Sequence, residues 1–196
     1  MYIYVKRFLD LLLVLITTPI WLPVGVILSV LVKLTSKGPV FFTQKRIGKN
    51  HIYFTIYKFR SMYTNTPKDV PTHLLQNSDT CITAIGRFLR RFSLDELPQI
   101  INIIKGELSI IGPRPALWNQ DDLIAEREKY SANNIPVGLT GLAQVKGRDE
   151  LSIKEKAAYD GEYAKKMGFI LDVWILYKTA ANVLLSRGVK EGGPGR

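Results

Sequence analysis

The sequence predicts a helix-dominated α+β fold that is anchored in a membrane, with a single domain covering residues 1–188. Three observations support this prediction. An apolar run near the N-terminus is long enough to enter a lipid bilayer. Two β-prone runs follow it and are separated by residues that favour a turn. Much of the remainder has apolar positions spaced by three and four, which is the spacing of an amphipathic helix.

From Leu11 to Val32 the chain carries no charged residue. As a straight helix this run would be about 33 Å long, and the hydrocarbon core of a bilayer is about 30 Å thick. A cleaved signal peptide is disfavoured, because the apolar run is too long and no small-x-small cleavage site follows it. The run therefore predicts membrane insertion.

Basic residues flank the apolar run on both sides. Lys6 and Arg7 precede it, and residues 33–68 contain basic residues but no acidic one. Positive charge marks the cytoplasmic side of a membrane, so both flanks are expected there. Pro19 and Pro23 inside the run predict a kink or break. A re-entrant segment that returns to the same face satisfies both observations, while a kinked single span remains open from the residues alone.

A β-hairpin is expected after the membrane segment. Val40–Thr43 and Ile52–Phe59 are rich in β-branched and aromatic residues, and Gly48-Lys49-Asn50 between them favours a turn. Residues 64–80 are expected to form an irregular loop.

Helices are expected over most of the remaining chain. A short basic helix covers Ile85–Phe92, a second runs from about Asp95 to Lys105, and a charged third covers Asn119–Tyr130. Asn133–Gly147 is interpreted as a glycine-containing loop, and residues 189–196 as a loose tail.

The last helix, Phe169–Leu185, has an apolar stripe that allows two interpretations. The stripe comprises Ile170, Val173, Trp174, Tyr177, Ala181 and Leu184. It either covers the core of the domain or lies in the membrane interface, where tryptophan and tyrosine are favoured.

The net charge of +10 predicts an anionic partner such as phosphate, nucleic acid or acidic lipid. Nucleic acid is not expected, because no binding motif is present and the basic residues cluster beside the membrane segment. Cys81 is the only cysteine, so an internal disulfide is excluded. His51 and His73 do not complete a zinc ligand set.

Asp95 and Glu96 are adjacent candidates for catalysis. A purely structural interpretation is a helix start, because Ser93-x-x-Glu96 matches a capping box and Asp95 is itself a suitable cap. A functional interpretation rests on the upstream cations Arg87, Arg90 and Arg91, because three cations are more than two carboxylates need for pairing. Carboxylates beside surplus guanidinium groups suit a magnesium-bound diphosphate.

Two further segments can bind phosphate. Gly112-Pro113-Arg114-Pro115 holds an arginine between two prolines, which restricts its backbone and pre-sets its guanidinium group. The alternative, favoured when this segment is taken alone, is a rigid turn whose arginine is only solvated. Thr140–Arg148 contributes glycines and another cation, without the spacing of a Walker or Rossmann motif.

Together these segments resemble the bacterial sugar transferase family, the short monotopic phosphoglycosyl transferases. The resemblance extends from Lys6 to about Gly188. Besides the proline-containing apolar run, its motifs are Phe42-Thr43-Gln44-Lys45-Arg46, Tyr57-Lys58-Phe59-Arg60-Ser61-Met62, Ser93-Leu94-Asp95-Glu96-Leu97-Pro98-Gln99, Gly106-Glu107-Leu108-Ser109-Ile110-Ile111-Gly112-Pro113-Arg114-Pro115 and Thr140-Gly141-Leu142-Ala143-Gln144-Val145-Lys146-Gly147-Arg148.

The resemblance implies a two-step reaction. Asp95 attacks the sugar-linked phosphorus of a UDP-sugar, UMP leaves, and undecaprenyl phosphate then takes the phosphosugar from the aspartyl intermediate. Asp95 and Glu96 are expected to bind Mg²⁺, with Glu96 assisting the metal or the second substrate. Family arginines near the phosphates correspond to Arg90, Arg114 and Arg148, and Lys58 and Arg60 are weaker matches.

The resemblance also implies a location and a set of partners. Residues 8–32 would form a re-entrant membrane segment of the bacterial inner membrane, and residues 33–188 a cytoplasmic catalytic part. Candidate partners are the UDP-sugar, undecaprenyl phosphate, membrane lipid and a second copy of the chain. The sugar is expected to be N-acetylated, with 6-deoxy forms included. The alternatives are a one-step metal-assisted transferase and a non-catalytic basic membrane tether.

The chain departs from the family pattern at two places. Val137-Gly138 stands where the family has Pro-Gly, and Leu22 replaces the serine that commonly precedes the proline at the bend. Because Pro19 is an extra proline, the bend is expected at Pro19, at Pro23 or across both.

Overall fold

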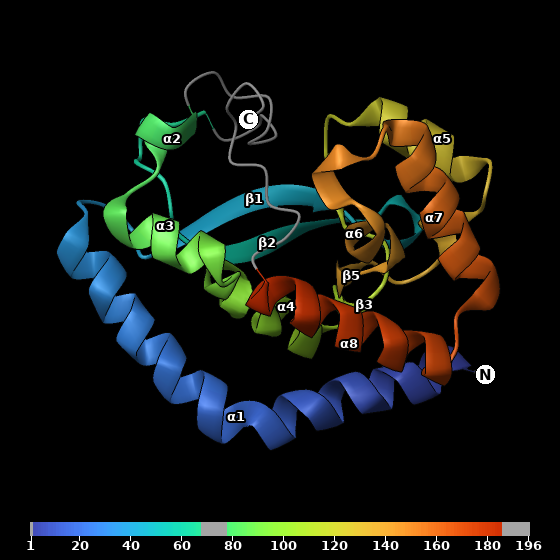
Figure 1. Cartoon of the computed structure of the whole chain (residues 1–196), viewed down its shortest axis with the longest axis horizontal. Helices are drawn as coiled ribbons and strands as arrows, with labels where there is room; N and C mark the ends of the chain where they lie inside the picture. Colours follow the sequence, from blue (N-terminus) through green and yellow to red (C-terminus); the bar gives the residue numbers. More distant parts are fainter. Residues whose placement is uncertain (1, 68–77, 186–196) are drawn as a thin grey trace.

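The computed structural model describes residues 2–67 and 78–185 of the chain. Its longest element is helix α1 (Tyr2–Thr35), which lies along one edge of the molecule. Figure 1 shows the other labelled helices and strands on one side of α1, so the chain consists of a long bent helix and one body above it. The predicted tail 189–196 and residues 68–77 of the predicted loop lie outside the described residues.

The outer face of α1 is apolar and exposed. Side chains more than half exposed include Phe8, Leu15, Ile16, Ile20, Val26 and Leu34. Buried apolar side chains of α1 are fewer, namely Val14, Leu28 and Val32. A core helix of a water-soluble domain would bury such residues, so this exposed surface is compatible with a helix that contacts lipid. By length and composition α1 is also the one helix among the described residues that could cross a membrane.

Helix α1 is bent near its middle but is not interrupted (Figure 1). The carbonyl of Val14 accepts hydrogen bonds from the Thr18 hydroxyl at 2.8 Å and from the indole N–H of Trp21 at 3.0 Å. A side chain seven residues along can reach this carbonyl because the bend opens the helix there. These bonds lie in the turn before Pro19, which places the bend there. The helix is bent but continuous, and not broken as the fold prediction stated.

Charged side chains fasten the N-terminal arm of α1 to the body. Asp172 of helix α8 (Phe169–Leu184) accepts bonds from Lys6 Nζ at 2.7 Å, from Tyr2 at 2.8 Å and from Tyr163 at 2.7 Å. On the next turn of α1, the carboxylate of Asp10 accepts a bond from the Ser109 hydroxyl at 2.6 Å. These groups are buried, and such burial is tolerated because each charge has partners.

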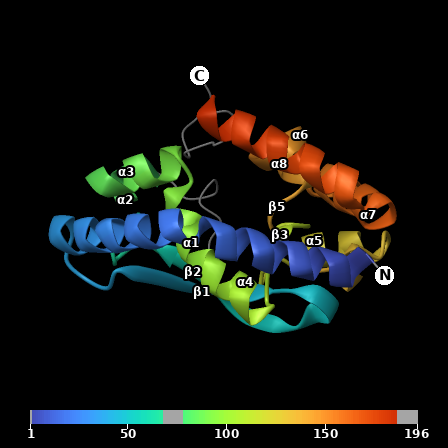
Figure 2. The same ribbon diagram turned by 90° about the horizontal axis from the view of Figure 1, so that it is seen from below.

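Apolar contacts and a buried arginine hold the C-terminal arm of α1. Leu28 and Val32 pack against Phe59 and Leu89. Arg60 donates to the carbonyl oxygens of Ser36 at 2.6 Å and Lys37 at 2.9 Å, so it satisfies backbone acceptors just after the helix ends. Both arms of α1 therefore contact the same body. Figure 2, the view from below, shows α1 running across the body, with α8 beside one half and α3 beside the other.

The predicted hairpin is confirmed. Strands β1 (Phe41–Ile47) and β2 (Tyr53–Phe59) pair antiparallel from Phe41↔Phe59 to Ile47↔Tyr53, and the 3₁₀ turn η1 (Lys49–His51) connects them. Strand β4 (Ala116–Leu117) extends this sheet in the order β2-β1-β4.

A second, parallel pair of strands was missed by the sequence analysis. Strand β3 (Ser109–Ile111) pairs with β5 (Gly138–Thr140), so the predicted loop Asn133–Gly147 in fact contains β5 and helix α6 (Leu142–Lys146). A Cβ atom at Gly138 would lie 2.1 Å from the backbone nitrogen of Gly112, so this approach of two backbones needs glycine. The presence of Val137 in place of the family's proline is compatible with this strand.

The remaining helices surround the sheets. They are α2 (Ser78–Cys81), α3 (Ala84–Arg91), η3 (Leu94–Gln99), α4 (Ile100–Lys105), α5 (Asp121–Glu128), η4 (Ala132–Asn134), η5 (Arg148–Glu150) and α7 (Ile153–Lys166). Helix α7 was not predicted, although Ser152 and Glu155 form a complete capping box at its start.

The exposure of side chains on helix α8 decides between the two interpretations of its apolar stripe. Ile170 is 85% exposed, Tyr177 67% and Val173 49%, whereas Asp172 and Ile175 form the buried face. The stripe therefore does not cover the core. It faces outward, as a helix in a membrane interface requires.

We predict that Asp172→Ala weakens the attachment of α1. The substitution leaves the buried Lys6 ammonium without its carboxylate, and loss of one partner of a buried pair costs about 3 kcal/mol. Chemical unfolding in detergent should therefore show a lower free energy of unfolding, with faster proteolysis within residues 2–35. Asp121→Ala, an exposed carboxylate on α5, is the control. Equal losses in the two variants would contradict a structural role for Asp172.

Candidate active site

The segment that carries the adjacent carboxylates has an unusual local structure. Ser93 adopts a left-handed conformation with φ of 54°, and its side chain makes no capping bond. Residues Leu94–Gln99 then form a 3₁₀ helix before α4 begins. The predicted capping box from Ser93 to Glu96 is wrong, and so is a cap at Asp95, which lies inside the 3₁₀ turn. The carboxylates are therefore available for other contacts.

Glu96 is held by two cations from different elements. Its Oε1 atom accepts bonds from Lys58 Nζ of β2 at 2.7 Å and from Arg114 Nη2 at 2.6 Å. Burial alone would raise the pKa of Glu96, but Arg114 and Lys58 outweigh burial and hold this pKa well below its usual range. Glu96 is thus a fixed anion.

Asp95 is in the opposite electrostatic situation. Burial raises the pKa of Asp95, and the charge of Glu96 adds to the effect, although Lys58, Arg90 and Arg114 oppose it. A partly desolvated carboxylate of raised basicity, surrounded by cations, is suited to attack an electrophile that carries negative charge.

Two buried arginines hold the backbone on either side of the Arg114–Pro115 peptide. Arg127 of α5 donates to the carbonyl of Arg114 at 3.0 Å, and Arg46 of β1 donates to the carbonyl of Pro115 at 3.0 Å. Arg127 is itself paired with Asp160 of α7 at 2.6 Å. The prolines restrict this segment and the two arginines fix its position, so the Arg114 guanidinium group is aimed at Glu96.

A basic cavity opens on the Asp95 side of the carboxylate pair. It has a volume of about 420 Å³ and lies between the hairpin and α3. Its lining includes Asp95 and the cationic residues Arg46, Lys58, Arg60 and Arg90. Burial lowers the pKa of Arg46 to about 9, which still leaves it protonated at neutral pH. This concentration of positive charge suits a phosphate or diphosphate ligand.

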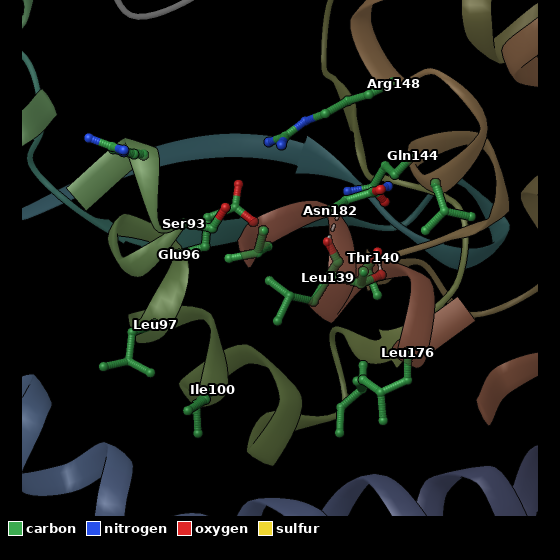
Figure 3. A pocket seen from close by; sticks show the side chains of 15 residues that line it. Ser93, Glu96, Leu97, Ile100, Leu139, Thr140, Gln144, Arg148, Leu176 and Asn182 are labelled. Atoms are coloured by element: carbon green, nitrogen blue, oxygen red, sulfur yellow. Dashed lines mark hydrogen bonds between the residues drawn. The ribbon is translucent and has the colours of Figure 1, made fainter. Parts of the chain in front are cut away.

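An apolar cavity lies on the Glu96 side. It has a volume of about 240 Å³ and is lined by residues of η3, α4, β5, α6 and α8. Figure 3 shows Glu96 on one side of this cavity, with Arg148 extending toward it from the other side. Leu97, Ile100, Leu139 and Leu176 form its apolar walls (Figure 3).

The structure brings most of the predicted site residues together. Lys58 and Arg114 bind Glu96, while Arg90 lies in the basic cavity and Arg148 in the apolar one. Arg60 also lines the basic cavity, but its guanidinium group bonds to residues Ser36 and Lys37 after α1, so part of its role is structural.

Sequence reasoning missed the residues that position the site. Arg46 belongs to one of the family motifs but was not predicted as a site residue. Arg127 and Asp160 belong to no motif that the sequence analysis identified. Their pairing joins α5 to α7, two helices between which β5 and α6 lie in the sequence. An arginine that acts through a backbone carbonyl leaves no spacing pattern in the sequence.

Among the described residues, no group of three or more histidine, cysteine, aspartate or glutamate side chains is arranged to hold a metal ion. Mg²⁺ is commonly bound by one or two carboxylates together with substrate phosphates, so Asp95 beside a diphosphate fits this ion. Glu96 fits it less well, because Lys58 and Arg114 already neutralise its charge.

Comparison with known proteins gives a consistent result. A family model described as bacterial sugar transferase matches residues 1–186. The chain is 34% identical over 197 residues to the exopolysaccharide production protein ExoY of Sinorhizobium fredii, covering 93% of this chain and 87% of that protein.

Two larger relatives are also similar. Identity is 37% to the UDP-N-acetylgalactosamine-undecaprenyl-phosphate N-acetylgalactosaminephosphotransferase of Aeromonas hydrophila, covering 96% of this chain and 46% of that protein. It is 39% to the UDP-glucose:undecaprenyl-phosphate glucose-1-phosphate transferase of Xanthomonas campestris, covering 83% of this chain and 35% of that protein. The chain thus spans less than half of each of these two relatives.

We predict that the two carboxylates differ in their effect on stability. The raised pKa of Asp95 means that its ionised form costs folding free energy at neutral pH, so Asp95→Asn should leave the unfolding temperature unchanged or raise it. The lowered pKa of Glu96 means that its ionised form stabilises the fold above the ordinary carboxylate pKa. Glu96→Gln removes the charge that pairs with Lys58 and Arg114 and should cost about 3 kcal/mol. Thermal unfolding of both variants in detergent at neutral pH measures the difference, and the reverse order would contradict the assignment.

Proposed function

Because the chain belongs to the bacterial sugar transferase family, we propose that it transfers a sugar 1-phosphate from a UDP-sugar to undecaprenyl phosphate and releases UMP. The resemblance seen in the sequence is confirmed, and the chain is a phosphoglycosyl transferase like the relatives named for this activity. The proposal adds the mechanism, the substrates and the arrangement in the membrane.

The observation that carries the mechanism is the different state of the two carboxylates. Lys58 and Arg114 both bind Oε1 of Glu96, so this oxygen atom is poorly placed to attack a substrate. Asp95 lines the basic cavity, where a diphosphate would be attracted, and its pKa is raised. This contrast supports Asp95 as the nucleophile and Glu96 as the anion that holds Lys58 and Arg114 in place.

The proposed reaction has two displacements at one phosphorus atom. A carboxylate oxygen of Asp95 forms a bond to the sugar-linked phosphorus, and the bond from this phosphorus to the oxygen of UMP breaks, so UMP leaves with the electron pair. A phosphate oxygen of undecaprenyl phosphate then attacks the same phosphorus. The bond to Asp95 breaks, the carboxylate is regenerated, and undecaprenyl diphosphate sugar is the product.

Cations of the chain would stabilise both steps. Arg90 and Arg46 lie in the basic cavity with Asp95, and they can bind the charge that develops on the leaving UMP phosphate. Mg²⁺, bound by Asp95 and the diphosphate oxygens, would supply further neutralisation of the substrate.

We propose that α1 is a re-entrant membrane helix, with residues 8–32 in the bilayer of the bacterial inner membrane. Two observations support this arrangement: both arms of α1 contact the same body, and basic residues flank the apolar run at both ends. The outward apolar stripe of α8 would then lie in the interface of the cytoplasmic leaflet. Residues 33–188 would face the cytoplasm.

The proposed product is the first lipid-linked intermediate of a capsule, exopolysaccharide or glycoprotein glycan. The proposed sugar is an N-acetylated hexose, with 6-deoxy forms included. One relative is named for N-acetylgalactosamine, whereas others are named for glucose and galactose. Release of UMP from a panel of UDP-sugars identifies the donor.

We predict that Asp95→Asn abolishes turnover and the trapped phosphosugar adduct. An amide cannot form the acyl phosphate, so activity should fall by at least about a thousandfold, a loss of about 4 kcal/mol of transition-state stabilisation. The measurement is UMP release together with mass spectrometry of the protein after incubation with the donor alone. Glu96→Gln should impair turnover while an adduct still forms.

Two outcomes of this experiment would contradict the proposal. An adduct on the Asp95→Asn protein would exclude Asp95 as the nucleophile. No exchange of labelled UMP into the UDP-sugar in the absence of lipid would support the one-step metal-assisted alternative. The tether alternative requires full function in both variants, and it is already disfavoured by membership of a transferase family.

The re-entrant arrangement makes a separate prediction. A single cysteine placed at Ile3 in a Cys81→Ser background should resist membrane-impermeant thiol reagents in intact cells and react after the membrane is permeabilised. A cysteine in the body, at exposed Lys154, is the cytoplasmic control. Labelling of the Ile3 position in intact cells would show that α1 spans the membrane.

A further inference from the structure

The apolar cavity has no role in the mechanism so far, although Glu96 lines it. Apolar side chains supply most of its exposed wall, with Leu97 and Ile100 on one side and Leu139 and Leu176 on the other. Uncharged polar residues also line it, namely Ser93, Thr140, Gln144, Thr179 and Asn182. A UDP-sugar is polar along its whole length, so this lining does not match the donor. It matches a hydrocarbon chain.

The floor of the apolar cavity rests on the membrane helix. Ile100 and Leu139 pack in one cluster with Val14 and Trp21 of α1. Leu97 lies so near α1 that a Cβ atom at Gly25 would be 3.8 Å from its Cδ2 atom. The cavity is therefore on the side of the active site that faces the bend of α1.

Three charged residues line the apolar cavity, namely Arg91, Glu96 and Arg148. The Arg148 charge acts on the Glu96 carboxylate. An amphiphile with an anionic head and a hydrocarbon tail has the same distribution of charge, because its phosphate needs cations and its tail needs an apolar wall.

We propose that the apolar cavity binds the first isoprene units of the polyprenyl phosphate acceptor, while the nucleoside part of the donor occupies the basic cavity. This inference rests on the proposed function. Its basis is the position of the adjacent residues Asp95 and Glu96, which line the basic and the apolar cavity respectively.

The two-step chemistry explains why both cavities meet at the carboxylate pair. Each displacement at phosphorus proceeds in line, so UMP departs from the side opposite Asp95 and the acceptor phosphate must enter from that same side. The two substrates thus share one phosphate position. Their remaining parts differ, and each extends into the cavity that matches its polarity.

A matched pair of variants on α8 tests this inference. Leu176→Trp places a large ring in the apolar cavity, and Leu176 is 39% exposed, so the substitution does not overfill the core. Ile170→Trp makes the same kind of change on the outward face of α8, where the side chain is 85% exposed. Each variant is assayed for UMP exchange with the UDP-sugar alone and for transfer to undecaprenyl phosphate.

We expect Leu176→Trp to exchange UMP at the wild-type rate and to show a KM for undecaprenyl phosphate raised by about tenfold or more, with Ile170→Trp normal in both assays. An unchanged acceptor KM in a Leu176→Trp protein that still exchanges UMP would overturn the inference. Slower UMP exchange with a normal acceptor KM would assign the cavity to the donor and overturn it as well. A wild-type protein that fails to exchange UMP would instead contradict the proposed function.

Photocrosslinking of the unaltered enzyme gives a test that does not depend on a variant. The probe is a prenyl phosphate with a diazirine on its second isoprene unit, and undecaprenyl phosphate is the competitor. Crosslinks to residues 97–100, 139–145 or 176–183, removed by the competitor, would support the inference. Competed crosslinks confined to the hairpin residues 41–59 or to the outer face of α1 would overturn it.

Discussion

The double ion pair of Glu96 with Lys58 and Arg114 is the interaction on which the site depends. It joins the hairpin, the 3₁₀ turn and the proline-rich connector through a single buried oxygen atom. Loss of Glu96 would remove the carboxylate that pairs with the buried Lys58 ammonium, and removal of one member of a buried pair is strongly destabilising. Because both cations bind Glu96, we propose the neighbouring Asp95 as the carboxylate that reacts.

The same principle extends outward from the site. Arg127 fixes the Arg114 backbone and is paired with Asp160, so helix α7 contributes to the active site without contacting it. The Lys6–Asp172 pair attaches α1 to α8 in the same way. Buried charges are expensive unless paired, and each pair here links elements far apart in the sequence. The fold therefore holds its catalytic geometry with a few specific ion pairs as well as with apolar packing.

The sequence predicted those parts of the structure that depend on local patterns. The hairpin over residues 41–59 and the helices near Ile85, Asn119 and Phe169 followed from composition and spacing. Short-range patterns failed where long-range contacts decide the outcome. Ser93-x-x-Glu96 resembles a capping box, yet Glu96 is drawn to Lys58 and Arg114. The real capping box begins at Ser152, where Glu155 forms no ion pair with any of the described residues.

The bend of α1 allows both arms of the helix to contact the body that carries the site. If α1 were straight, only one arm could lie against the body, and either the Lys6–Asp172 pair or the packing of Val32 would be lost to lipid. The bend also presents Val14 and Trp21 toward the floor of the apolar cavity. A single helix thus has an exposed apolar outer face and an inner face that supports the candidate active site. In the proposed mechanism, this arrangement lets an acceptor whose tail stays in the bilayer bring its phosphate to the position that the UMP phosphate has left.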